Sequence, residues 1–277
     1  MVVDLATPAT EEEILVLQRL GLEPTTQLIY VLRNLIIAVA ASKGGVGKTE
    51  IAKEIAWLLG GVLMDLDWDA GGITRKWGYF TETRVNAPLL DSFTSGKTPR
   101  PLLGGPTRAD LVPSHPDLAH NQPDADQVTV MLEKWQQEWA RPLVTDNHPG
   151  GSDIAYGSMA AAHVVVVPQP VAKNELEALE GMLRELRSYP LMIIPNQNLG
   201  PEVIPDRLLS RLEELSATYG VPLGPSIGYN RWLRERERRM AVMASDPMPA
   251  RYRDYADEVR NAARAIVLYA AQRMEAA

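Results

Sequence analysis

The sequence predicts an α/β fold, in which a mostly parallel, twisted sheet carries helices on both faces. Short runs of apolar residues alternate along the chain with longer segments of helical periodicity, the pattern of strand–helix–strand units. Several of the runs end in polar residues, as buried strands of open α/β sheets do where ligands bind. The 277 residues, 45% of them hydrophobic, are enough for one large domain.

The most informative segment is Ser-Lys-Gly-Gly-Val-Gly-Lys-Thr, from Ser42 to Thr49. It follows an apolar run over 35–41, predicted as a buried strand, and precedes a predicted helix over 51–59 that ends at glycine. A glycine-rich turn in this place points backbone N–H groups into one concavity, where the helix N-terminus adds partial positive charge. We therefore predict a phosphate loop, in which Lys48 reaches the phosphates and the Thr49 hydroxyl ligates Mg²⁺.

The string from Lys43 to Thr49 resembles the deviant phosphate loop of the ParA/MinD family of P-loop ATPases, and is closest to that of ParA-type DNA partition ATPases. Ser42 stands where the common motif has glycine, and Lys43 is an additional lysine. The resemblance implies the same fold, ATP and Mg²⁺ as ligands, and a nucleotide-dependent homodimer in which Lys43 reaches the partner's nucleotide. The other loop residues expected to contact nucleotide are Gly44, Gly45, Val46, Gly47 and Glu50.

Two further predicted strands end in aspartates. The strand over 61–67 ends with Asp65 and Asp67 on one face, and the strand over 142–146 ends in Asp146. A single aspartate beside a phosphate loop can hold the water shell of Mg²⁺, the role we assign to Asp146. The resemblance implies that Asp67 positions the attacking water, supported by Asp65; Asp67 is also a candidate Mg²⁺ ligand.

Both aspartate segments depart from the family pattern in the residues that follow. Trp68-Asp69 stands in place of Pro-Gln, and Asn147-His148 in place of Thr-Pro. We interpret His148 as a bystander near the phosphates, with a catalytic role as the alternative.

Asn196 ends a predicted strand over 191–196 and matches the family's adenine-contacting position. Its amide can donate and accept together, which suits a purine edge; the alternative is an ordinary turn residue. Further strands are expected over 109–114, 160–170 and 221–227, and helices over 89–95, 122–139, 174–188, 205–219 and 250–274. Trp135 and Trp139, one helical turn apart, are interpreted as core.

Residues 1–34 precede the phosphate-loop strand, and helical spacing over 11–20 is followed by a second apolar stretch over 28–32. We expect 1–34 to form a helical appendage that packs on the domain or on a partner subunit. Residues 35–277 are expected to form the P-loop ATPase domain with its C-terminal helices.

The segment 231–239 contains five arginines and two glutamates in a chain of net charge −7. Helical spacing would place Arg231, Arg234 and Arg238 on one face, and with Arg239 we predict a stripe that contacts DNA phosphates without reading sequence. The alternative is a solvated helix with internal Arg–Glu pairs.

The amino-acid composition excludes several other protein families that have this type of phosphate loop. The chain has no cysteine, so it lacks the ligands of nitrogenase iron protein and of iron–sulfur carriers, and the cysteines of the arsenite pump ATPase. It has no window of about eighteen apolar residues, and its first residues are unlike a signal peptide. We therefore expect a cytoplasmic protein. The last helix is alanine-rich, so no membrane binding is expected.

These features together predict an ATPase, slow and stimulated by a partner, that serves plasmid or chromosome partition. The family resemblance implies that the ATP-bound dimer binds nonspecific DNA, which makes it nucleoid-associated, and that a ParB-like centromere-binding protein stimulates hydrolysis. The alternatives are a MinD-like spatial regulator at a membrane and a non-hydrolysing, ATP-gated DNA-binding regulator. A bacterial tyrosine kinase fits less well, because the chain has no C-terminal tyrosine cluster.

Overall fold

The computed structural model describes residues 7–69, 72–83, 87–199, 203–236 and 240–276. Within these ranges seven strands form one sheet in the order β3-β2-β4-β1-β5-β6-β7, and every neighbouring pair is parallel. The predicted α/β fold with a parallel sheet is therefore confirmed. The strands are β1 (Ile36–Val39), β2 (Val62–Leu66), β3 (Asp110–Val112), β4 (Leu143–Asn147), β5 (Val164–Gln169), β6 (Leu191–Asn198) and β7 (Ile227–Gly228).

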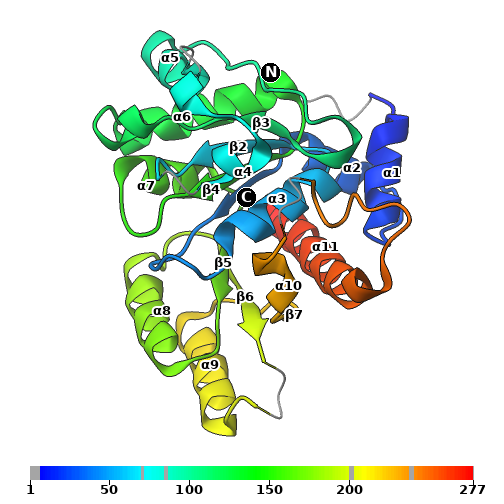
Figure 1. The fold of residues 1–277 in the computed structure, drawn as a ribbon, viewed down its shortest axis with the longest axis vertical. Helices are drawn as coiled ribbons and strands as arrows, with labels where there is room; N and C mark the ends of the chain where they lie inside the picture. The colour runs from blue at the N-terminus through cyan, green and yellow to red at the C-terminus, as the bar shows by residue number, and fades with distance from the viewer. Residues whose placement is uncertain (1–6, 70–71, 84–86, 200–202, 237–239, 277) are drawn as a thin grey trace.

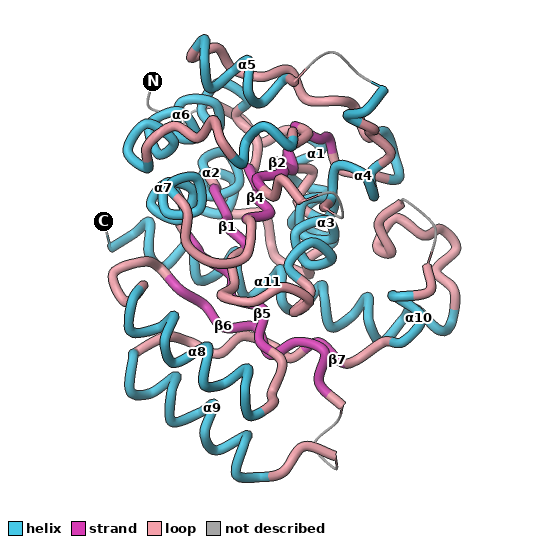
Figure 2. The backbone as a smooth tube through the Cα atoms, turned by 60° about the vertical axis from the view of Figure 1, so that its left-hand side comes forward, coloured by secondary structure: helices cyan, strands magenta, loops and turns pink. Residues whose placement is uncertain are grey.

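Helices cover both faces of this sheet (Figures 1 and 2). One face packs against α1 (Glu11–Arg19), α2 (Thr26–Asn34), α3 (Lys48–Leu58) and α11 (Arg253–Ala276). The other packs against α5 (Pro88–Ser95), α6 (Ala125–Trp139), α7 (Asp153–Ala161), α8 (Lys173–Glu185) and α9 (Asp206–Tyr219). The short helices α4 (Ile73–Trp77) and α10 (Arg231–Arg234) follow β2 and β7.

The central strand β1 shows why the sheet is covered twice. Ile37 and Val39 belong to the core under α3 and α11, whereas Ile36 and Ala38 belong to the core under α6 and α7. Successive side chains of a strand point to opposite faces, so a continuous apolar run is buried on both sides.

The two N-terminal helices pack on the rest of the chain, the first of the two arrangements expected. Leu17 and Leu32 lie in the same core cluster as α3 and α11. Arg33, 7% exposed, pairs with Glu13 at 2.6 Å and ties the two helices together. The division of the chain at residue 34 stays a prediction.

Several elements differ from the sequence-based expectation. The strand expected over 160–170 begins at Val164, because Ala160 and Ala161 end α7, which was not predicted. The last strand, β7, has two residues. Trp135 is fully buried in the core, as predicted, whereas Trp139 is partly buried and packs against the same core cluster. No helix in the described ranges combines the length and apolar character needed to cross a bilayer.

The sheet order places the two aspartate-bearing strands beside each other and next to the phosphate-loop strand. The chain leaves β1 for β2 on one side of the sheet, and later crosses from β4 to β5 on the other side of β1. Ligands of open α/β sheets bind outside the carboxyl ends of the strands at such a reversal.

Candidate nucleotide-binding site

The segment between β1 and α3 has the shape that a phosphate loop requires. Gly45 and Gly47 adopt positive φ angles of 79° and 95°, which glycine tolerates better than other residues. A Cβ at Gly47 would lie 2.4 Å from the Asn196 amide nitrogen, so a side chain there would collide with its neighbour. Helix α3 begins at Lys48 directly after Gly47, so its first N–H groups face the loop.

Side chains of strand β6 donate hydrogen bonds to main-chain carbonyls of this loop. Asn196 Nδ2 donates to the Val46 carbonyl at 2.6 Å, and Gln197 Nε2 donates to the Gly45 carbonyl at 2.8 Å. Asn196 is buried and also lines the cavity beside the loop. Its predicted contact with adenine stays a prediction. The sequence reasoning missed Gln197, whose position after a matched asparagine was the available signal.

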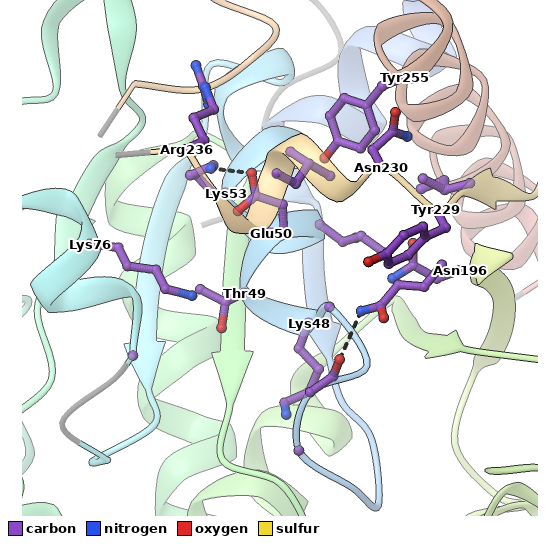
Figure 3. Close-up of a pocket in the computed structure, with 18 of the residues that line it drawn as sticks. Lys48, Thr49, Glu50, Lys53, Lys76, Asn196, Tyr229, Asn230, Arg236 and Tyr255 are labelled. Atoms are coloured by element: carbon purple, nitrogen blue, oxygen red, sulfur yellow. Dashed lines mark hydrogen bonds and ion pairs between the residues drawn. The ribbon is translucent and has the colours of Figure 1, made fainter. Parts of the chain in front are cut away.

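A cavity of about 620 Å³ opens beside the loop, within the size range of small-molecule sites. Figure 3 shows side chains from α3, α4, β6, the segment after β7 and α11 around it. Its lining residues include Gly44, Gly45, Gly47, Lys48, Thr49, Glu50, Lys53, Asp67, Asp69, Lys76, Asn196, Gln197, Tyr229, Asn230, Arg236 and Tyr255. The phosphate loop and the carboxylates therefore face one space.

Lys48 and Thr49 occupy the first turn of α3 at the base of the cavity. Lys48 is 6% exposed; burial lowers its pKa, against the charges of Asp146, Asp67 and Asp69. Glu50 forms an ion pair with Lys53 along the cavity wall. Val46 is buried beneath the loop.

Carboxylates at the ends of β2 and β4 form an acidic edge, made of Asp65, Asp67, Asp69 and Asp146, of which Asp67 and Asp69 line the cavity. Asp65 and Asp146 are register partners on adjacent strands, and both are fully buried. Asp65 accepts hydrogen bonds from the Thr74 and Asp67 N–H groups, at 2.8 and 3.0 Å. Burial, then the charge of Asp146, raises the pKa of Asp65 to about 8. Asp65 therefore holds the turn after β2, and its supporting role in hydrolysis stays a prediction.

Asp146 differs from Asp65 because neither of its oxygens accepts a hydrogen bond of good geometry from a described residue, although the Thr49 hydroxyl lies nearby. Burial raises the pKa of Asp146 to about 6, although the nearby Thr49 hydroxyl and Lys48 ammonium act to lower it. A buried carboxylate without a well-placed donor calls for a cation or for water. Together with the Thr49 hydroxyl it offers the hard oxygen donors that Mg²⁺ prefers, so the residues fit the predicted ion.

Asp67 is half-buried and lines the cavity. Its Oδ1 accepts from the Asp69 N–H at 3.0 Å, and burial raises its pKa. The donor atoms of Asp67, Asp69 and His148 all lie within 4.8 Å of one another. Asp67 can therefore face a water molecule or an ion in the cavity.

The two departures from the family pattern contact each other. The rings of Trp68 and His148 stack with centroids 4.0 Å apart and planes 6° apart, and His148 Nε2 lies 3.4 Å from Asp69 Oδ2. The preceding Asn147 is buried and donates to the Val39 carbonyl at 3.1 Å. The loops after β2 and β4 are thus joined by side chains that the sequence reasoning left unconnected.

Lys43 lies outside the cavity. Its side chain is exposed, and Nζ donates to the carbonyl of Asn174 in the first turn of α8 at 2.9 Å. In this arrangement Lys43 does not lie among the residues that line the same chain's cavity, so its predicted cross-subunit contact stays a prediction.

The sequence predicted one continuous helix with Arg231, Arg234 and Arg238 on the same face, and this prediction is wrong. Helix α10 ends at Arg234, so no helix continues through the described Arg236 to align Arg231 with Arg238. Arg231 pairs with Glu235 at 2.9 Å, a contact that the solvated-helix alternative anticipated. Arg238 and Arg239 lie outside the described residues. Arg236 lines the cavity and donates to the Met240 carbonyl at 2.9 Å.

Comparison with known proteins gives one similar sequence of assigned function. The chain is 31% identical over 169 residues to the chromosome-partitioning ATPase Soj of Thermus thermophilus. The match covers 59% of this chain and 66% of Soj, just under two thirds of that protein's length. No family model matches the sequence.

Solved structures share the fold over most of the chain. Apo McdA of Cyanothece has a TM-score of 0.68 at 18% identity, covering 84% of this chain and 99% of McdA. MinD of Pyrococcus horikoshii, complexed with Mg-ADP, has a TM-score of 0.60 at 18% identity, covering 83% of this chain and 94% of MinD. Identities this low establish the fold alone.

Proposed function

We propose that the chain, whose phosphate-loop sequence and fold resemble those of the ParA/MinD family of P-loop ATPases, is an ATP-dependent switch for DNA partition. In this proposal ATP closes a homodimer that binds nonspecific DNA, and hydrolysis opens it. The observation that carries the proposal is the cavity between the phosphate loop and the acidic edge. The loop glycines, Lys48 and Thr49 line it together with Asp67 and Asp69, and the buried Asp146 lies close to Lys48 and Thr49.

The phosphate loop and the acidic edge have different roles in the proposed hydrolysis. Loop N–H groups and Lys48 would hold the phosphates of ATP, and Thr49 and Asp146 would hold Mg²⁺, whose positive charge would offset the negative charge of the phosphates. Asp67, on the opposite wall, orients a water for in-line attack on the γ-phosphate. Phosphoryl transfer depends mainly on such positioning and charge stabilisation.

Lys43 couples hydrolysis to the dimer in this proposal. Its single described bond, to the Asn174 carbonyl, is exposed, and such a bond contributes only about 1 kcal/mol. Lys43 can therefore leave α8 and reach a partner's γ-phosphate without disturbing the fold. A lysine supplied across the interface makes hydrolysis depend on dimer formation.

DNA contact is assigned to the segment that contains Arg231, Arg234, Arg238 and Arg239, and stimulation of hydrolysis to a ParB-like partner. Because Arg231 is paired with Glu235, we expect it to contribute less than an unpaired arginine would. The ATP-bound dimer is then nucleoid-associated. A membrane-bound regulator is less well supported, since α11 buries its apolar residues Val259, Ile266 and Val267 in the core.

Light scattering and DNA-binding anisotropy with ADP, ATP and no nucleotide test the proposal. We expect a dimer and DNA binding with ATP alone, and loss of both in Lys43→Ala. Lys97→Ala, which removes an exposed lysine far along the chain from the loop, is the matched control and should behave as wild type. DNA binding that ignores nucleotide, or a Lys43→Ala dimer with normal turnover, would contradict the switch.

A further inference from the structure

Lys76 lies across the cavity from the phosphate loop, and nothing in the loop motif points to it. It belongs to α4 and lines the same cavity as Lys48 and Thr49. Figure 3 shows its side chain extending into the cavity, with the ammonium directed toward Thr49. Its charge also acts on the buried Asp146, whose pKa it helps to lower.

Helix α4 is held firmly enough to direct this side chain. The Thr74 N–H donates to the buried Asp65 carboxylate at 2.8 Å, and the Thr74 hydroxyl accepts from the Ser114 N–H at 2.8 Å. Trp77 Nε1 donates to the Ala109 carbonyl at 2.8 Å. These bonds fix both ends of the short helix to the ends of β2 and β3, so Lys76 is presented from a rigid element.

The neighbouring residue Arg75 shows the opposite arrangement. Arg75 forms an ion pair with Glu82, and its guanidinium lies over the Phe80 ring at 5.3 Å. Lys76 has no carboxylate within ion-pair distance among the described residues. Arg75 is thus paired with Glu82 outside the cavity, whereas Lys76 faces into it.

The negative charges around the cavity favour a positively charged side chain at the position of Lys76. The acidic edge contributes Asp67, Asp69 and Asp146 to the surroundings of Lys48. A bound triphosphate would add further negative charge near these carboxylates, and the exposed Lys76 side chain is free to approach it. Lys48 reaches the phosphates from the loop side, whereas Lys76 approaches from the side of the carboxylates.

We propose that Lys76 contacts the terminal phosphate of the bound nucleotide from within the same subunit, and so distinguishes a nucleoside triphosphate from a diphosphate. This deepens, and rests on, the proposed ATP switch. The phosphate gains a second lysine in addition to Lys48, placed opposite the loop. Lys76 then also shields the terminal phosphate from Asp67 and Asp69 as water is positioned.

Nucleotide titrations of the intact protein with Mg²⁺, followed by calorimetry, test this assignment. We expect Lys76→Ala to weaken ATP affinity about tenfold, since one charge-assisted hydrogen bond is worth about 1.4 kcal/mol or more. ADP affinity should change less than twofold. Lys76→Arg should restore most of the preference for ATP, and the matched control Arg75→Ala should bind both nucleotides as wild type does.

The outcomes separate this inference from the proposed function. Equal losses of ATP and ADP affinity in Lys76→Ala, or no loss of either, would overturn the terminal-phosphate contact while leaving the switch intact. Failure of the wild-type protein itself to bind ATP would overturn the proposed function. Thermal melting without nucleotide, expected to be unchanged in Lys76→Ala, shows that the variant is folded.

Discussion

The two walls of the nucleotide cavity are built in different ways. The phosphate loop is one continuous segment whose main-chain N–H groups are proposed to hold the phosphates, with two glycines in left-handed conformations. The acidic edge is assembled from side chains that follow two strands, β2 and β4, which lie about eighty residues apart in the sequence but side by side in the sheet. A wall made from main chain follows from local spacing, whereas a wall made from side chains depends on the fold.

Replacing Asp67 should produce the largest effect, because it removes the group proposed to orient water and leaves the phosphate loop intact. Asp67→Asn retains an oxygen that can accept from the Asp69 N–H. We expect kcat for ATP hydrolysis to fall on the order of 10²–10³-fold, with KM nearly unchanged. Steady-state phosphate release measures this. Asp69→Asn, at an exposed side chain, is the control and should lose less than threefold; an equal loss would assign the effect to the charge of the whole edge.

Changing the phosphate loop should weaken nucleotide binding more than it slows the hydrolysis step. Gly47→Ala forces a φ of 95° on alanine and places its Cβ 2.4 Å from the Asn196 amide. Strain of about 2 kcal/mol corresponds to roughly a 30-fold loss of nucleotide affinity. Titration of a fluorescent ATP analogue measures this loss. Gly44 has a Cβ position with no atom within 4 Å and no left-handed φ, so Gly44→Ala should bind nearly normally. Similar losses in both variants would contradict the strain argument.

This difference also explains how much the sequence could predict. Glycine spacing between an apolar run and a helix predicted the phosphate loop, and strand-ending aspartates predicted Asp65, Asp67 and Asp146. The contact between Trp68 and His148 could not be predicted, because nothing local indicates that β2 and β4 are neighbours. The orientation of Lys76 depends likewise on three bonds that fix α4.

The arginine segment shows a different limit of sequence reasoning. Its spacing fits a helical face, but the helix ends at Arg234, and Arg236 turns to the Met240 carbonyl. Periodicity over nine residues suggests a helix without fixing its length, because competing tertiary contacts decide where a short helix ends.

Asn196 braces the main chain of the phosphate loop with its side chain, and its replacement should have an intermediate effect. Asn196→Ala removes the 2.6 Å bond to the Val46 carbonyl and leaves a buried acceptor unpaired. About 1.4 kcal/mol, or tenfold in ATP affinity, is expected. Titration with ATP and GTP sharpens the interpretation. Equal losses indicate that Asn196 only braces the loop, whereas a larger loss for ATP supports the predicted adenine contact.

Asp146→Asn should give the smallest effect and the clearest pH signature. Burial raises the pKa of Asp146 to about 6, above its ordinary value near 3.9 in an unfolded chain. Between these two pKa values the carboxyl is therefore protonated in the folded state and ionised in the unfolded state. The stability linked to this proton is fully present below about pH 4 and disappears as pH rises through about 6. Asparagine imitates the neutral acid at every pH, and it retains an oxygen that can accept from the nearby Thr49 hydroxyl.

Without nucleotide, Asp146→Asn should therefore melt at nearly the wild-type temperature at pH 4.5 and about 2–4 °C higher at pH 7.5, equivalent to roughly 1 kcal/mol in a chain of this size. With ATP and Mg²⁺ the order should reverse, since the variant lacks the carboxylate proposed to hold the ion. Scanning calorimetry at both pH values tests each half separately. A difference in melting temperature that stays constant with pH would mean that Asp146 remains ionised in the folded protein. The acidic edge would then have to be stabilised by its lysines, Lys48 and Lys76, before any nucleotide binds.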